Sequence, residues 1–129
     1  GSLGTVPGLD PSNPAASAMA KIGEANGFAG GDAFVGESYD AAALMLLAMA
    51  SAKSSDPQVY KDHVMKVANG TGEKIYPGEL AKGIKLASYG IAIDYVGASS
   101  VTLIGPGEAA GNFREIQIQN GKMVDVNYR

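Results

Sequence analysis

The stretch FVGESYDAAALMLLAMASAKSSDP, residues 34 to 57, carries the clearest signal for the fold. Its centre, Ala41 to Ala50, is the longest apolar run in the chain. That run is about half of the ~20 residues that a helix needs to span a bilayer, so it predicts a buried helix. Because the helix is apolar nearly all round, it needs neighbours on several faces, which a small isolated domain does not readily provide.

Residues on either side of this run predict where two helices begin. Ser38 is expected to cap the apolar helix, and Asp56 with Pro57 is expected to start the next one. Ser and Asp side chains accept hydrogen bonds from the free N–H groups of a first helical turn, where proline also fits. That next helix is expected to end at Asn69-Gly70, and its inner stripe is expected to be Tyr60, Val64, Val67 and Ala68.

Two further helices are predicted around this pair. The first starts with Asn13 as its cap and Pro14 as its first residue, and it ends at Asn26-Gly27. The other places Leu80, Ile84 and Ala87 on one face, and Gly83 inside it costs about 1 kcal/mol relative to alanine. The segment TGEKIYPG, residues 71 to 78, is expected to be a loop.

The last third of the chain changes character. The runs VTLI (101–104), FREIQIQ (113–119) and KMVDVNY (122–128) are β-branched and partly alternating, which is typical of strands. Asn120-Gly121 predicts a type I′ hairpin turn, and the mismatch of Phe113 with Ile116 suggests a bulge. With a strand end at residues 1 to 6, the fold class is α/β, with helices followed by a short β-hairpin tail.

The glycine turn VTLIGPGEAAGNF, residues 101 to 113, raises the question of a nucleotide site. A dinucleotide fingerprint is spaced G-x-G-x-x-G and opens a helix. Here the spacing is one residue too long, and a strand-like run follows. We therefore expect a loop joining two strands, in which Gly105, Gly107 and Gly111 allow tight backbone angles.

Composition excludes several functional classes. The chain has 129 residues, 46% of them hydrophobic and 18% charged, which is typical of one soluble globular domain. The net charge is −3 with no basic block, which argues against a nucleic-acid partner. The absence of cysteine excludes disulfides, thiolate chemistry and cysteine-based zinc sites. No signal peptide is visible, so an exported protein would carry its leader outside these residues.

No catalytic set, metal site or cofactor site is predicted. His63 is the only histidine, and the sequence shows neither a nucleophile nor an orienting group for it. We expect a surface or edge histidine.

The segment GESYD, residues 36 to 40, is the best candidate for a binding site. Glu37, Ser38 and Tyr39 lie at the start of the apolar helix, where free N–H groups and a partial positive charge suit an anionic group. The alternative is structural: Ser38 caps the helix, Asp40 favours the helix dipole and Tyr39 packs. The sequence leaves both interpretations open.

Four segments in order resemble one known family: GTVPGLDPSNPAA (4–16), residues 34 to 57, PGELAKGIKLASYGIAIDYVGASSVTL (77–103) and GNFREIQIQNGKMV (111–124). The chain resembles the C-terminal third of type I periplasmic solute-binding proteins, in the branch that binds leucine, isoleucine and valine for ABC transporters. The similarity covers nearly all of the chain. GPGEAAG departs from the family's more usual acidic turn.

The resemblance implies a two-lobed fold with three-layer α/β/α lobes joined by three crossovers. Residues 1 to 129 would be the C-terminal part of this ligand-binding domain. Residues 1 to 6 and 113 to 129 would belong to the second lobe, and residues 12 to 104 to the first. GTVPG and GNFRE would mark two crossovers, and an N-terminal part of the same protein would cover the apolar helix.

The resemblance also implies a function without bond breaking. A small solute, such as an amino acid or a related carboxylate, would be held between the lobes by hinge closure and delivered to a membrane ABC permease in the periplasm. Tyr39 would face the cleft, with Glu37 and Ser38 beside it. A sensory ligand-binding domain of the same architecture and a small α/β enzyme are the alternatives.

Overall fold

The computed structural model describes residues 1–105 and 107–129, and it is a mixed α/β structure. Pro106, which is part of the glycine turn at residues 101 to 113, lies outside the described residues. The helices are α1 (Pro14–Asn26), α2 (Val35–Ala52), α3 (Pro57–Ala68) and α4 (Leu80–Ser88). The strands are β1 (Leu3–Pro7), β2 (Glu73–Ile75), β3 (Ile93–Tyr95), β4 (Thr102–Gly105), β5 (Glu108–Ala110), β6 (Phe113–Gln119) and β7 (Lys122–Tyr128).

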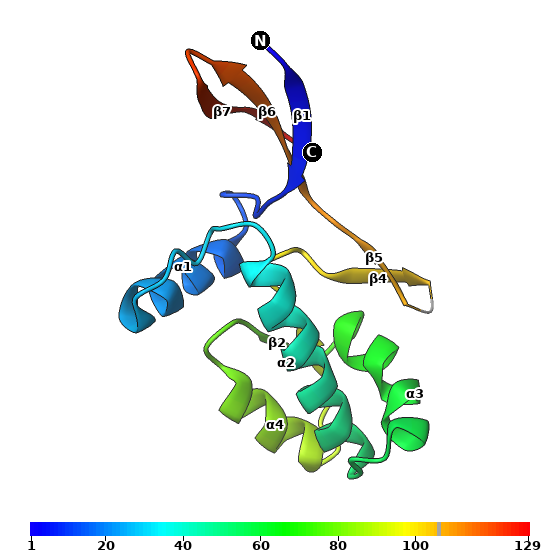
Figure 1. The fold of residues 1–129 in the computed structure, drawn as a ribbon. Helices are drawn as coiled ribbons and strands as arrows, with labels where there is room; N and C mark the ends of the chain where they lie inside the picture. The colour runs from blue at the N-terminus through cyan, green and yellow to red at the C-terminus, as the bar shows by residue number, and fades with distance from the viewer. Residues whose placement is uncertain (106) are drawn as a thin grey trace.

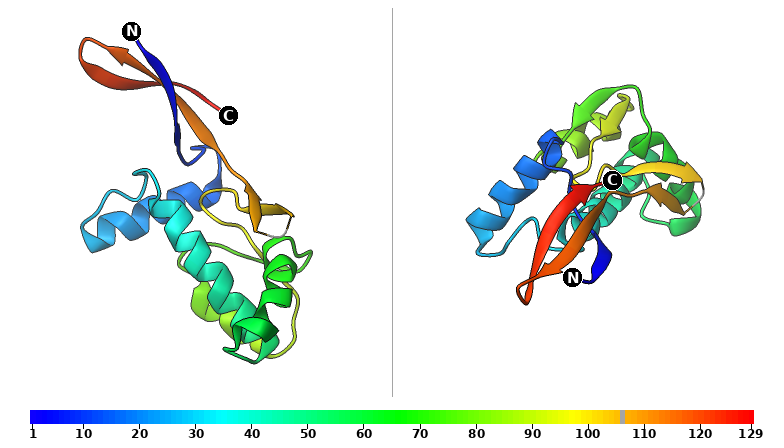
Figure 2. Two further views of the ribbon diagram at one scale, coloured as in Figure 1. Left: turned by 45° about the vertical axis from the view of Figure 1, so that its right-hand side comes forward. Right: turned by 90° about the horizontal axis from the view of Figure 1, so that it is seen from above.

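The molecule has two parts (Figure 1). Strands β1, β6 and β7 form an antiparallel tail sheet in the order β1-β6-β7, and it extends away from the helices in the turned view of Figure 2 as well. The four helices with the pairs β2–β3 and β4–β5 form the body. The chain passes between the two parts after β1 and again before β6. These connections are neighbours, because the Gly8 N–H donates to the Asn112 carbonyl oxygen at 3.3 Å.

The hairpin between β6 and β7 confirms a prediction made from a two-residue signal. Asn120 and Gly121 have φ angles of 52° and 76°, the positive values that a type I′ turn requires. The register between the strands shifts between Glu115 and Ile116, which confirms the bulge.

The core of the body lies where α2, α3 and α4 pack over the parallel pair β2–β3. Gly83 allows α4 to pack closely against α2 and β2. A Cβ at this position would lie 2.8 Å from Leu47 Cδ2 and 2.9 Å from Ile75 Cγ2. The glycine therefore loses helix propensity but permits this packing. The buried residues of the cluster are Ala43, Leu44, Leu47, Ala48, Val67, Ala68, Ile75, Ala87, Ile93 and Tyr95.

Two helix starts agree with their predicted caps. The Asn13 side chain accepts a hydrogen bond from the Ala15 N–H at 2.9 Å, and the Asp56 side chain accepts one from the Gln58 N–H at 2.9 Å. Proline follows each cap. These caps could be predicted from the sequence because each hydrogen bond joins residues only two positions apart.

The predicted cap of α2 was wrong. Its N-cap is Phe34, which has a left-handed φ of 69° and no side-chain cap, so Ser38 lies inside the helix. The Ser38 N–H is already bonded to the Phe34 carbonyl oxygen at 3.0 Å. A preceding turn, in which the Val35 N–H bonds to the Asp32 carbonyl oxygen, supplies the start instead.

Three other predictions need correction. Residues 73 to 75 are strand β2 and not loop, because they pair with β3. The glycine turn does not join residues 101–104 directly to 113–119, because β5 pairs back on β4 first; among its three glycines only Gly107 has a positive φ. Ile84, expected on the inner face of α4, is 37% exposed.

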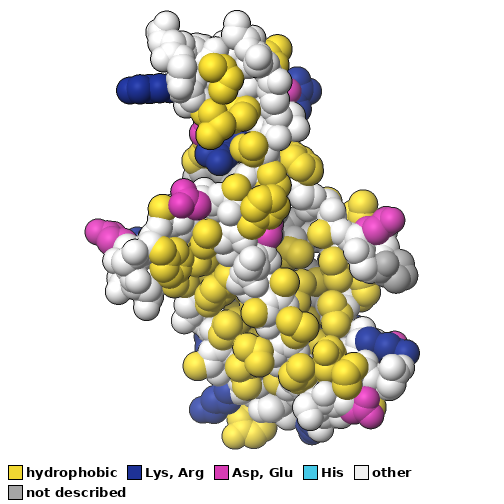
Figure 3. All heavy atoms as spheres, in the orientation of Figure 1, with side chains coloured by type: hydrophobic (Ala, Val, Ile, Leu, Met, Phe, Trp, Pro, Cys, Tyr) yellow, Lys and Arg dark blue, Asp and Glu magenta, His cyan; other side chains and the backbone are white. Residues whose placement is uncertain are grey.

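The apolar helix α2 is covered on one side only. Its buried face includes Leu44 and Leu47, whereas Met45 and Leu46 are 45% and 46% exposed. Figure 3 shows hydrophobic atoms spread across the face of the body where α2 lies. The expectation that this helix is buried on most sides is therefore not met by the described residues.

Candidate functional site

The three predicted binding residues occupy the first turn of α2 but do not converge. Ser38 is exposed, and Glu37 and Tyr39 are half-buried. Consecutive helical residues point about 100° apart, which explains the separation. Glu37 Oε2 is shielded from solvent and has no hydrogen-bond partner among the described residues. A carboxylate oxygen in this position can accept a hydrogen bond from an incoming donor.

Tyr39 takes part in the packing of the body. Its ring contacts the main core cluster and also a second cluster formed by Leu9, Ala16, Met19 and Ala98. Its hydroxyl oxygen accepts a hydrogen bond from the Gly78 N–H at 3.0 Å, just before α4. Tyr39 therefore links α1, α2 and the start of α4.

Asp40 is the group whose role the sequence did not reveal. Only 1% exposed, its carboxylate accepts four hydrogen bonds. They come from the Tyr95 hydroxyl (2.7 Å), the Ala98 N–H (3.1 Å), the Ser99 N–H (2.8 Å) and the Ser99 hydroxyl (2.6 Å). Buried charge is tolerated only when it is hydrogen-bonded in this way. Asp40 therefore fixes the segment that follows β3 onto the start of α2.

Two neighbours show how tightly this segment is held. A Cβ at Gly97 would lie 2.5 Å from Asp40 Oδ2, so only glycine fits there. Burial, together with the Asp40 charge and its hydrogen bond, raises the pKa of Tyr95 far above its ordinary value. The Tyr95 hydroxyl therefore keeps its proton and remains a donor to Asp40. In the sequence, the sign that Asp40 has a structural role is its position as an acidic residue on the buried side of an apolar helix.

A second polar group lies where the body meets the tail sheet. Asn13 Nδ2 and Asn112 Nδ2 both donate to Ser100 Oγ, at 3.0 and 2.9 Å. Asn13 Nδ2 also lies 3.1 Å from the Gly97 carbonyl oxygen. We call Asn13, Ser100 and Asn112 the junction brace. It joins both connecting segments to the same loop of the body.

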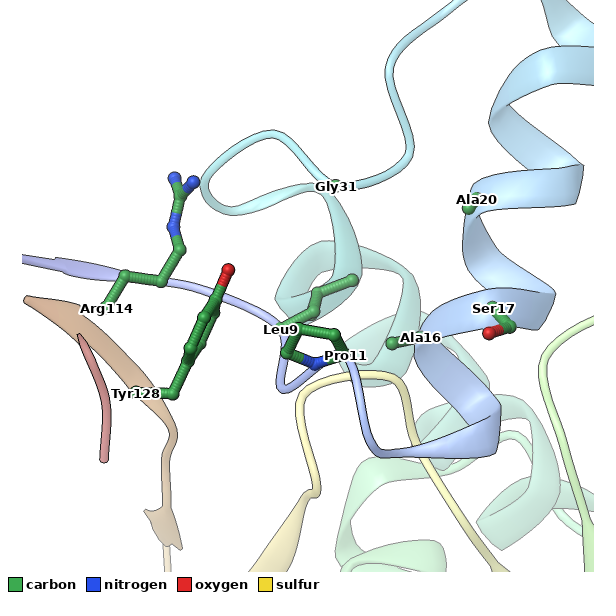
Figure 4. A pocket seen from close by; sticks show the side chains of 8 residues that line it. All are labelled: Leu9, Pro11, Ala16, Ser17, Ala20, Gly31, Arg114 and Tyr128. Atoms are coloured by element: carbon green, nitrogen blue, oxygen red, sulfur yellow. The ribbon is translucent and has the colours of Figure 1, made fainter. Parts of the chain in front are cut away.

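A cavity of about 270 Å³ opens next to this junction (Figure 4). One wall comes from the body and the other from the tail sheet, whose Arg114 and Tyr128 side chains lie beside each other. Neither residue could be assigned to a site from the sequence, because they face the cavity only once the tail sheet has formed. The lining residues are Leu9, Pro11, Ala16, Ser17, Ala20, Gly31, Arg114 and Tyr128.

His63 is half-buried, and its Nδ1 lies 2.8 Å from Ser51 Oγ, so the pair bridges α2 and α3. Within residues 1–105 and 107–129, no group of three His, Cys, Asp or Glu side chains is placed to hold a metal ion. Among the same residues, no helix has the length and hydropathy that crossing a bilayer requires.

Comparison of the chain with protein-family models, with curated proteins and with solved structures gave no match.

Proposed function

We propose that this chain belongs to the ligand-binding component of an ABC importer. It would bind an amino acid or a similar small solute between two lobes, close around it by hinge motion and deliver it to a membrane permease. The proposal includes a periplasmic location and an N-terminal part of the same protein that completes both lobes.

The observation that carries this proposal is the cavity at the junction of the body and the tail sheet. Its walls come from two parts of the molecule, which the segments after β1 and before β6 connect. A solute that contacts both walls favours whichever arrangement brings them together, which is how ligand binding shifts an equilibrium between open and closed forms.

The connectivity gives further support. Residues 3 to 7 and 113 to 128 pair in one sheet although more than 100 residues separate the ends of the chain. The intervening residues form the body. This arrangement is what the resemblance implies for two crossovers at GTVPG and GNFRE.

Exposed apolar surface supports the proposed N-terminal part. Met45 and Leu46 on α2 are nearly half exposed, and among the described residues β2–β3 is a parallel pair of two strands. Parallel sheets occur almost only with both faces covered, so further elements packed against this pair would complete the lobe.

The test is a thermal-shift screen of the protein with amino acids and small carboxylates. A ligand at a hundred times its Kd stabilises the folded state by about 2.7 kcal/mol, which is readily detected. The variant Ala20→Phe places a ring in the cavity and is expected to abolish the shift. Ala25→Phe is the matched control, since Ala25 is an exposed residue of α1 outside the cavity lining. Absence of a shift with every solute would contradict the proposal.

A further inference from the structure

We infer that Asn120 is a site of spontaneous deamidation that loosens the β6–β7 hairpin, and that the fold protects two identical dipeptides from the same reaction. Asn-Gly occurs three times, at residues 26–27, 69–70 and 120–121. Asparagine is chemically labile, most of all before glycine, whose backbone N–H no side chain shields. All three asparagines are exposed to solvent, so burial does not distinguish them.

The reaction needs no reagent other than water. The backbone nitrogen of the glycine loses its proton and bonds to Cγ of the asparagine, while the side-chain nitrogen takes up a proton and leaves as ammonia. Water then opens the resulting ring at either carbonyl carbon, adding its hydroxyl to the carbon and its hydrogen to the nitrogen. The product is an aspartate, or an isoaspartate in which the main chain is longer by one atom. Either product carries a carboxylate in place of the amide.

The structure leaves both reacting groups free at residue 120. Within residues 1–105 and 107–129, neither the Asn120 side chain nor the Gly121 N–H makes a hydrogen bond. A Cβ built at Gly121 would meet no atom within 4 Å, so the glycine has room to move. The type I′ turn requires the positive φ angles of these two residues, which Asn-Gly adopts readily. The dipeptide that this turn favours is therefore also the labile one.

Attack requires the turn to open, because the Gly121 nitrogen must move toward Asn120 Cγ. The following strand, β7, pairs with β6 at the edge of the tail sheet, and all of its residues are exposed. Exposed ends of secondary structure open locally at the lowest cost in free energy. The movement that the reaction needs is therefore accessible from the folded state.

Asn69 is held at both ends of its amide. Its Nδ2 donates to the Leu103 carbonyl oxygen at 2.6 Å, and its Oδ1 accepts from the Leu103 N–H at 2.9 Å. The side chain thus pairs with β4 as a neighbouring strand would. A Cβ at Gly70 would overlap the Ile93 carbonyl oxygen, so this glycine is packed closely against β3. Reaction at Asn69 must break both hydrogen bonds and displace Gly70.

Asn26 is intermediate between these two sites. Its Nδ2 donates to the Ile22 carbonyl oxygen at 2.8 Å, and the Gly27 N–H closes the end of α1 by bonding to the Glu24 carbonyl oxygen at 3.4 Å. A Cβ at Gly27 would meet no atom within 4 Å, so only these hydrogen bonds restrain the dipeptide. The structure therefore orders the reactivity as Asn120 first, Asn26 second and Asn69 last.

The experiment incubates the folded protein in mildly alkaline buffer and measures the acid formed at each asparagine by peptide mapping with mass spectrometry. Because Asn69 must first lose two hydrogen bonds that Asn120 lacks, Asn120 is expected to react at least about tenfold faster. In urea the three sites should react at similar rates, since the dipeptide is the same. Any other order in the folded protein, or the same order persisting in urea, overturns the inference.

Two controls lie in the same hairpin. Asn127 is also exposed but precedes Tyr128, so it should keep its amide. Asn120→Gly leaves a Gly-Gly pair, which still suits a type I′ turn. This variant should no longer gain a carboxylate at residue 120, and its rates at Asn26 and Asn69 should match those of the wild type. Altered rates at these two sites would show that the fold does not protect each of them separately.

Hydrogen exchange tests the effect on the hairpin. The isoaspartate form is separated from unreacted protein by ion exchange, because it carries one more negative charge. Its longer turn no longer fits the pairing of Gln119 with Lys122, so the amides of β7 should exchange faster than in the unreacted protein. The Ile118 N–H, which donates to the Ser2 carbonyl oxygen at 2.9 Å, should stay protected. Unchanged exchange in β7 would overturn the loosening of the hairpin.

Discussion

At the scale of single residues, Asp40 constrains the body most. Its carboxylate is buried and accepts hydrogen bonds from Tyr95, Ala98 and Ser99, which lie more than 50 residues further along the chain. Every donor in this network depends on the same acceptor group. Loss of the carboxylate would leave several buried donors without a partner at once.

We predict that Asp40→Ala destabilises the protein by about 3 kcal/mol, because each buried donor left without an acceptor costs roughly 1–3 kcal/mol. Urea unfolding followed by circular dichroism measures the loss. Asp62→Asn, which changes an exposed carboxylate of α3, should alter stability by less than about 0.5 kcal/mol. Equal unfolding midpoints for wild type and Asp40→Ala would show that the network contributes little.

Tyr95 predicts a specific pH dependence. Its pKa is raised in the folded state, first by burial and then by Asp40. In the unfolded chain Tyr95 ionises near its ordinary pKa of about 10. The stability that folding gains from keeping this hydroxyl protonated is therefore fully present below that pH and is lost as the pH rises further. Above this pH the stability of the wild type should fall by about 1.4 kcal/mol per pH unit more steeply than that of Tyr95→Phe. Urea titrations between neutral and strongly alkaline pH test this, and parallel curves would refute it.

At the scale of elements, the junction brace connects the start of α1, the loop after β3 and the segment before β6. Asn13 has two roles, since its Oδ1 caps α1 while its Nδ2 donates to Ser100 Oγ. Asn112 has only the second of these side-chain contacts. Substitutions of the two asparagines can therefore separate the effect of the junction brace on stability from the effect of the α1 cap.

We predict that Asn112→Ala lowers stability by about 1 kcal/mol through the lost hydrogen bond, and that Asn13→Ala lowers it by about 2 kcal/mol because a cap is lost as well. Hydrogen exchange should increase at Gly8 in both variants and at Ala15 only in Asn13→Ala. The double variant of Asn112 and Ser100 should cost less than the two single changes added together. Additive losses would mean that the brace does not act as a unit.

Elements that could be predicted from sequence are those specified by neighbouring residues. The caps at Asn13 and Asp56 and the turn at Asn120-Gly121 involve contacts only a few residues apart. The start of α2 and strand β2 could not be predicted in this way. Phe34 adopts its left-handed conformation within an irregular connection, and β2 exists through pairing with β3 about 20 residues later.

At the scale of the whole molecule, the tail sheet presents apolar side chains to solvent. Leu3 is 76% exposed and Met123 is 70% exposed, and the register places them on opposite faces of the sheet. Among residues 1–105 and 107–129, no further strand pairs with β1 or β7, which are the edges of this sheet. Apolar faces and unpaired edges together are a template for association with other chains.

We predict that these 129 residues self-associate as concentration rises, and that the double variant Leu3→Lys, Met123→Lys shifts them toward the monomer. Sedimentation velocity over a dilution series measures both. Gln119→Lys with Asn127→Lys adds the same charge at exposed polar positions of the sheet and is expected to change association less. A monomer throughout the series would show that these surfaces do not need a partner.

The candidate site shows the limit of reasoning from one sequence. Glu37, Ser38 and Tyr39 adjoin one another in the sequence at a helix start, yet the helical period turns them to different sides. The cavity instead combines Leu9 and α1 with Arg114 and Tyr128, from opposite ends of the chain. No local pattern relates these residues.

The sequence by itself determined the α/β class, the capped starts of α1 and α3 and the hairpin of the tail, because each follows from composition or from contacts within a few residues. The tertiary structure alone decided that Asp40 is buried with four donors, that β2 pairs with β3 and that Arg114 faces a cavity. These features depend on burial and hydrogen bonds between segments that meet only after the chain has folded.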